Sequence, residues 1–152
     1  MNIWSEAVAG AAPGVPSRTR RGELLRRAAE GTLPELEFEA IVFRAGPNRN
    51  HLRIPDSEMP GFAASFVGVP FLRDHAVESV DARAGTVVSS VLDGRAIRQT
   101  IRLTTQRDIR AFLEGQMDRF SVSWYYDEVC CSVCGKEWGT CSHRPGRRYG
   151  DG

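Results

Sequence analysis

Lysine is nearly absent from this chain of 152 residues, because Lys136 is its only copy and arginine supplies the remaining positive charge. The 20 basic residues are balanced by 19 acidic ones, so overall charge gives no argument for nucleic-acid binding. No apolar run reaches the length of a membrane span. The segment Met1–Glu6 is neither basic nor followed by a long apolar stretch. We therefore expect neither a membrane helix nor a signal peptide.

Cysteine is also scarce, but its four copies are clustered between Cys130 and Cys141. Without a signal peptide we expect a reducing compartment, in which clustered cysteine and histidine indicate a metal site rather than disulfides. The best ligand set has the spacing C-x2-C-x6-C-x-H and consists of Cys131, Cys134, Cys141 and His143. Three thiolates and an imidazole suit a tetrahedral, structural Zn²⁺. Two alternatives stay open: Cys130 could replace His143, or the cysteines could be reduced and bind nothing.

The hydrophobic pattern predicts an α+β fold that is mostly antiparallel β, with a curled sheet or a small barrel and a few flanking helices. Strands are predicted at 35–43, 77–81, 86–92, 96–103 and 118–127, with a further short strand open at 51–54. Helices are predicted from about residue 18 to Gly31 and over 104–115, with a helical turn at 61–66. In the first strand Leu36, Phe38, Ala40 and Val42 fall on one face, and Glu35, Glu37 and Glu39 fall on the other. The pair Asp93-Gly94 predicts the turn of a hairpin. In the second helix Thr104 or Thr105 is the expected N-cap, and Ile109, Phe112 and Leu113 form the inner face. We expect three regions: a flexible N-terminal arm (1–18), a β domain (19–127) and a zinc-knuckle segment (128–149).

The last predicted strand carries two hydroxyl groups. Alternation places Phe120, Val122 and Trp124 on one face, and Ser121 and Ser123 on the other. A serine becomes a nucleophile only when a base lies within hydrogen-bond reach.

Of the three histidines, His75 is the natural base, because His143 belongs to the metal set and His51 lies in a polar stretch. From spacing alone this pairing is weak, since a serine and a histidine in a β protein are often unrelated.

The order of these motifs gives the pairing more weight. Phe71-Leu-Arg-Asp-His75 is followed by Phe120-Ser-Val-Ser-Trp124, and then by the cysteine cluster with its His143-Arg-Pro-Gly146 tail. Over residues 34–149 this series resembles the prohead, or capsid-maturation, serine proteases of tailed phages and prophages. That family is similar in fold to the herpesvirus assemblin proteases, and the cysteine cluster resembles a zinc-bearing subset of it.

The resemblance implies a serine endopeptidase in which His75 is the catalytic histidine and Ser121 the nucleophile. The family's glycine after the serine motif is replaced here by Ser123, which leaves open which of the two serines attacks. The implied substrate is a scaffold protein or the scaffolding part of the major capsid protein. The implied location is the host bacterial cytoplasm, inside the procapsid. Whether the chain forms a homo-oligomer is left open, and neither a membrane nor nucleic acid is an expected partner.

The resemblance also implies a further strand after Gly146, and the third catalytic group is expected on it or at the position where assemblins place a second histidine. This chain ends at Gly152, so we expect a C-terminally truncated or inactive form as one possibility. Two alternatives follow: an inactive protease remnant, or a non-enzymatic zinc module that binds protein or nucleic acid. Arg144, Arg147 and Arg148 beside the cluster support the second alternative, because they could contact phosphates.

Overall fold

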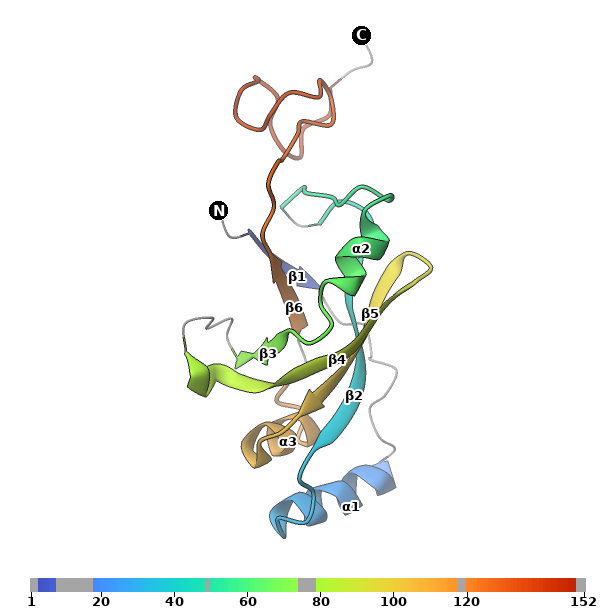
Figure 1. The fold of residues 1–152 in the computed structure, drawn as a ribbon, viewed down its shortest axis with the longest axis vertical. Coiled ribbons are helices and arrows are strands. Elements are labelled where there is room, and N and C mark those ends of the chain that lie inside the picture. The colour runs from blue at the N-terminus through green and yellow to red at the C-terminus, as the bar shows by residue number, and fades with distance from the viewer. Residues whose placement is uncertain (1–2, 8–17, 49, 74–78, 118–119, 150–152) are drawn as a thin grey trace.

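The computed structural model describes residues 3–7, 18–48, 50–73, 79–117 and 120–149. Strands and helices follow one another along the chain, and Figure 1 shows their arrangement. In order they are β1 (Ile3–Ala7), α1 (Arg18–Ala29), β2 (Leu36–Arg44), α2 (Met59–Ala64), β3 (Pro70–Leu72), the short 3₁₀ helix η2 (Val80–Ala82), β4 (Arg83–Asp93), β5 (Ala96–Leu103), α3 (Gln106–Leu113) and β6 (Phe120–Trp124).

The main sheet is antiparallel and has the strand order β2-β5-β4-β3. A second, two-stranded antiparallel sheet is formed by β1 and β6. The α+β class and the antiparallel pairing predicted from the sequence are therefore confirmed. The barrel alternative is not what the described residues form, because β2 and β3 lie at opposite edges of an open, strongly bent sheet (Figure 1).

Alternation along β2 explains which side of the sheet faces the core. Phe38, Ala40 and Val42 are buried, whereas the intervening Glu37 and Glu39 are exposed, as predicted. The pairing of β2 with β5 shifts register between Ile41 and Phe43. This bulge lets Phe43 turn inward beside Val42, so the strand buries two successive residues.

The hairpin between β4 and β5 is also as predicted. Asp93 pairs with Ala96, so the loop consists of Gly94 and Arg95 alone. Gly94 has a φ of 60°, a conformation that costs glycine little and most other residues more. The sequence Asp93-Gly94 therefore fixes the register of β4 against β5.

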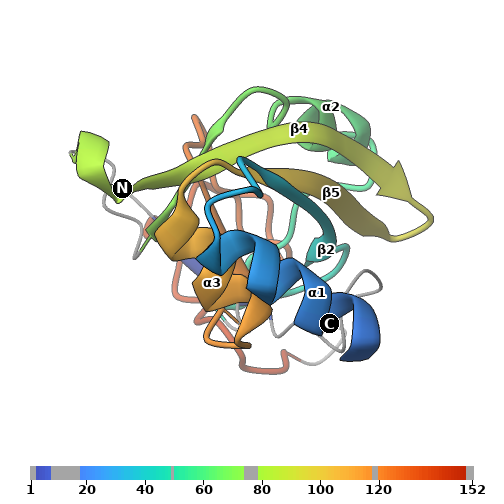
Figure 2. The ribbon, with the colours of Figure 1, turned by 90° about the horizontal axis from the view of Figure 1, so that it is seen from below.

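Helices α1 and α3 lie side by side at one end of the molecule, as Figure 2 shows from below. The Arg21 guanidinium of α1 donates to the carbonyl of Leu113 at the end of α3. Helix α3 begins as predicted, with the Thr105 side chain accepting from the backbone N–H of Asp108. Its inner face is the predicted one, since Ile109, Phe112 and Leu113 are buried.

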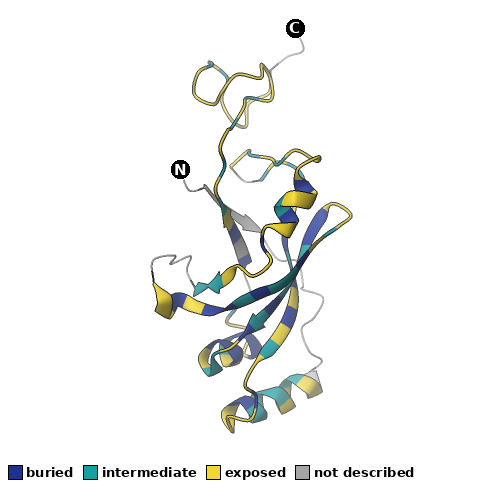
Figure 3. Ribbon diagram, in the orientation of Figure 1, coloured by how far each residue is buried: buried dark blue, intermediate teal, exposed yellow. Residues whose placement is uncertain are grey.

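An aromatic cluster joins the smaller sheet to the larger one. Phe38 on β2 stacks on Phe112 at 4.1 Å between ring centroids and lies 5.3 Å from Phe120 on β6. Phe43 makes a T-shaped contact with Trp124, also on β6, at 5.8 Å. Burial is concentrated on the main sheet and the helices against it (Figure 3). Strand β6 is thus held on the main core by two phenylalanine side chains of β2.

Three expectations need correction. The short strand expected at 51–54 is a loop in which Asn48 accepts through Oδ1 from the backbone N–H of Leu52, at 3.0 Å. The strand expected at 77–81 is wrong where it is described, because η2 occupies Val80–Ala82, and residues 77–78 lie outside the described residues. The expected arm contributes β1, which pairs with β6, while residues 8–17 lie outside the described residues.

None of the described helices has both the length and the apolar character that crossing a bilayer requires.

Candidate metal centre and serine strand

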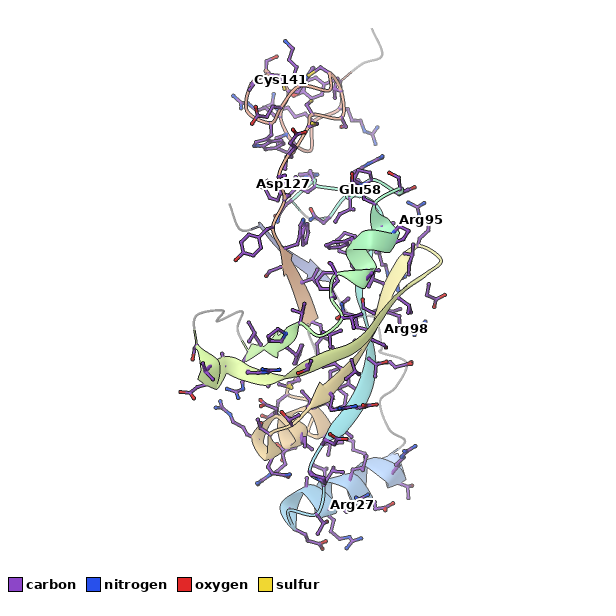
Figure 4. All side chains as sticks on the ribbon, viewed as in Figure 1. Arg27, Glu58, Arg95, Arg98, Asp127 and Cys141 are labelled. Atoms are coloured by element: carbon purple, nitrogen blue, oxygen red, sulfur yellow. The ribbon has the colours of Figure 1, made fainter. Side chains whose placement is uncertain are left out.

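The C-terminal part of the described chain forms a separate lobe, the metal lobe, defined here as Val129–Tyr149. It extends from β6 beyond α2, and Figure 4 marks Cys141 within it and Asp127 in the link. No residue of the metal lobe is buried. Hydrophobic burial therefore cannot be what holds this part of the chain in shape.

A short hairpin places the first two cysteines. Its rungs are a hydrogen bond from Trp138 N to Val129 O (2.7 Å) and one from Cys131 N to Lys136 O (2.8 Å). The loop closes when Gly135 N donates to Cys131 O at 2.8 Å, with Gly135 at a φ of 71°. Glycine is suited to that conformation, so Cys-x-x-Cys-Gly folds into a tight turn that directs both sulfurs to one point.

A second turn brings the remaining ligands back. Both the backbone N–H and the hydroxyl of Thr140 donate to the carbonyl of Glu137, at 3.1 and 2.7 Å. Gly139 lies within this turn at a φ of 86°. Cys141 and His143 follow directly, so the chain reverses onto the Cys131–Cys134 loop.

The predicted ligand set is brought together. One donor atom from each of Cys131, Cys134, Cys141 and His143 lies within 4.8 Å of all the others. Cys131 Sγ and His143 Nδ1 are 3.5 Å apart. Bond lengths of about 2.3 Å to sulfur and about 2.0 Å to nitrogen give a tetrahedral S···N edge of roughly 3.5 Å. The residues therefore fit a four-coordinate metal ion.

Cys130 is exposed and does not belong to this group, so the alternative in which it replaces His143 is not the observed arrangement. It lies opposite Glu137 in the hairpin, one residue before the first ligand. In a β ladder successive side chains point to opposite sides, which separates Cys130 from Cys131.

The thiols differ in acidity. The pKa of Cys131 is lowered to about 6, because backbone N–H groups of Cys134 and Val133 donate to its thiolate. The pKa of Cys141 is raised: a backbone N–H of His143 lowers it, but partial desolvation of the thiol and the neighbouring sulfurs outweigh that effect. One thiolate is thus prepared by the backbone, and a second forms readily only when a cation compensates its charge.

The serine strand β6 pairs with β1, with Glu6 opposite Ser121. Its apolar face is as predicted, since Phe120 and Val122 are buried and Trp124 packs on the core. Ser123 is exposed, and the side chain of Ser121 is outside what the structure describes.

His75 falls among residues 74–78, which lie outside the described residues, so the structure does not test its pairing with Ser121. The structure does describe the two strands next to these residues: β3, which leads toward His75, and β6, which carries Ser121. Phe71 of β3 lies 5.9 Å from Phe120, ring to ring, and Phe120 directly precedes Ser121. The strand that leads toward His75 therefore packs against the strand that carries the serines.

A buried ion pair near this approach was not predicted. Asp108, on α3, is 1% exposed and pairs with Arg73, the residue after β3. In the sequence, Thr105-x-x-Asp108 has the form of a helix-capping pair. That local pattern explains the presence of Asp108, so it gives no reason to expect a distant basic partner. The one further sequence feature that could have indicated a buried carboxylate is the place of Asp108 on the inner face of the helix, next to Ile109.

Models of known protein families give no match to this chain, and searches of curated proteins and of solved structures find no similar protein.

Proposed function

We propose that this chain is a zinc-containing serine endopeptidase of the capsid-maturation type. The observation that carries the proposal is the contact between Phe71 and Phe120, which packs the strand leading to His75 against the strand of Ser121. The series of motifs that resembles the prohead proteases supports the same assignment.

Zinc is the metal that this ligand set favours. Three sulfurs and one nitrogen fill four tetrahedral positions with soft and borderline donors, which excludes the oxygen-seeking Mg²⁺ and Ca²⁺. No position is left for a substrate or water, so the role of the ion is structural. Because the metal lobe has no buried residue, metal binding would supply most of the free energy that orders it.

In the proposed reaction the Ser121 hydroxyl oxygen forms a bond to the scissile carbonyl carbon, and His75 accepts the hydroxyl proton. The peptide C–N bond then breaks, and His75 returns the proton to the leaving amine. Water attacks the acyl-enzyme by the same route, which frees Ser121. Backbone N–H groups would stabilise the oxyanion. Ser123 remains the alternative nucleophile on the same strand.

The substrate proposed is an extended segment of a scaffold protein, or the scaffolding part of a major capsid protein. The proposed location is the interior of a procapsid in the host bacterial cytoplasm. Both proposals rest on the resemblance of the motif series to the prohead proteases. Enclosure with the scaffold would give the enzyme a high local concentration of substrate.

A second candidate is a non-enzymatic zinc module that binds nucleic acid. The observation in its favour is that Arg144, Arg147 and Arg148 are all exposed at the end of the metal lobe. Such a module would bind phosphates with an affinity that falls steeply with salt.

The two candidates are separated by a fluorophosphonate probe, which labels activated serines. Zinc-loaded full-length chain is treated with the probe, and the labelled residue is located by mass spectrometry. We expect labelling at Ser121 that is lost in Ser121→Ala and His75→Ala but kept in Ser123→Ala. Labelling that follows Ser123 would reassign the nucleophile. No labelling, together with salt-dependent binding of an oligonucleotide, would favour the second candidate.

A further inference from the structure

A buried carboxylate holds the chain where β3 ends. Asp108 accepts two hydrogen bonds from the Arg73 guanidinium, from Nε to Oδ1 at 2.8 Å and from Nη2 to Oδ2 at 3.2 Å. The Thr105 hydroxyl donates to the same carboxylate. Both oxygens are therefore used, and the planar two-point contact fixes the direction of the guanidinium as well as its distance.

Arg73 also reaches across to η2. Its Nη1 donates to the carbonyl oxygen of Asp81 at 2.6 Å. Arg73 directly precedes residues 74–78, and Asp81 follows three residues after them. A single guanidinium thus ties the chain on both sides of this short stretch, and Asp108 holds that guanidinium from α3.

Stability alone is a poor reason for this arrangement. Removing two charges from water costs free energy that their attraction only partly repays, and apolar residues of similar volume often stabilise a core as well. Asp108 is 1% exposed, while the Arg73 side chain is 22% exposed. What the pair supplies, and an apolar pair would not, is a defined orientation.

We infer that Asp108 is a positioning residue, which acts through Arg73 to fix the two ends of the stretch that contains His75. The inference rests on the proposed function, because His75 follows Arg73 by two residues. It adds that the catalytic geometry depends on a side chain of α3, an element that the motif series does not include.

The test measures the rate at which a fluorophosphonate labels the serine strand in zinc-loaded full-length chain. The variants are Asp108→Asn and Arg73→Lys, and the second keeps a positive charge but loses the planar fork. Ile97→Ala is the matched control, because Ile97 is fully buried on β5 close to the β4–β5 turn and its truncation destabilises the fold without touching Arg73. Rates are compared at equal folded fraction, determined by thermal unfolding of each variant.

We expect the limiting labelling rate at saturating probe to fall about a hundredfold in both variants, as for a misplaced catalytic group, with the half-saturating probe concentration unchanged. The control should keep the wild-type limiting rate. Equal limiting rates in Arg73→Lys, the control and the wild type would overturn the inference while leaving the proposed function in place. If Asp108→Asn does not fold, Arg73→Lys decides alone. A wild-type chain that is never labelled would remove the proposed function and the inference with it.

Discussion

The imidazole of His51 lies directly against the backbone of Gly146. A Cβ placed on Gly146 would be 2.7 Å from Nε2 and 2.9 Å from Cε1 of that ring. His51 projects from the loop that follows β2 and has a φ of 60°, the only positive φ at a described non-glycine residue. Gly146 belongs to the metal lobe. The contact therefore ties the metal lobe to the β domain at a point distant in sequence.

The first prediction concerns this contact. Gly146→Ala should lower the free energy of unfolding of the zinc-loaded chain by about 1–2 kcal/mol, because alanine is strained at a φ of 73°. His51→Ala should cost less, since it removes a side chain and leaves the backbone of the metal lobe unchanged. Denaturant unfolding of both single variants and of the double variant measures the coupling. A coupling of about 0.5 kcal/mol or more is expected for residues in contact, and strict additivity would contradict the observed packing.

The second prediction concerns the metal. Purified wild-type chain should contain zinc, and Cys134→Ser should lose it, because an exposed ligand is removed from a set of four. Cys130→Ser is the matched control and should keep the metal, since Cys130 lies outside the set. Metal content by mass spectrometry of the native protein reports both. Chelation should abolish amide protection in the metal lobe and leave the main sheet protected, because the metal lobe has no buried residue, whereas the main sheet carries much of the core. Zinc retained in Cys134→Ser would exclude the proposed ligand set.

The third prediction concerns pH. Thiols must release their protons to bind zinc, so zinc affinity should fall as the pH falls. Above about pH 6 Cys131 is already ionised and releases no proton on binding, whereas Cys141, whose pKa is raised, does. Below about pH 6 Cys131 releases one as well. The slope of the logarithm of zinc affinity against pH should therefore steepen by one or more on passing below pH 6. Competition with a chromophoric chelator measures this slope, and an unchanged slope would argue against the lowered pKa.

The fourth prediction concerns the closest approach of two strands. A Cβ on Gly85 of β4 would lie 1.9 Å from the carbonyl oxygen of Arg102 on β5, a backbone atom that cannot rotate away. Gly85→Ala should lower the free energy of unfolding by about 3 kcal/mol or more, because the two strands must separate. Gly61→Ala in α2 is the control, since its Cβ would meet nothing within 4 Å. That control should be neutral or stabilising by up to about 1 kcal/mol. Denaturant titration that ranks the two variants in the opposite order would contradict the described pairing.

Local patterns predicted most of the individual elements. The alternation over Leu36–Val42, the turn at Asp93-Gly94 and the cap at Thr105 each depend on a few neighbouring residues, and the structure confirms them. The gathering of the four candidate ligands was predictable for the same reason, because their spacing within thirteen residues determines where two tight turns can place them.

Contacts between distant segments were not predictable in this way. The pairing of β1 with β6 joins residues more than a hundred positions apart, and nothing in Ile3–Ala7 identifies its partner. The ion pair between Arg73 and Asp108 is similar, since each residue has an ordinary local explanation as a charged loop residue or a helix cap. The contact of His51 with Gly146 depends on how a loop and the metal lobe meet. Such choices are decided by packing of the whole chain rather than by local preference.

The most direct test of the central claim is hydrolysis of peptide bonds. Zinc-loaded full-length chain is incubated with a library of unstructured peptides, and products are identified by mass spectrometry, with Ser121→Ala as the control. We predict cleavage at a restricted set of sequences by the wild type and at least a thousandfold less by Ser121→Ala, the scale at which serine hydrolases lose activity without their nucleophile. No cleavage by the wild type, or equal cleavage by both chains, would contradict the assignment of this protein as a serine endopeptidase.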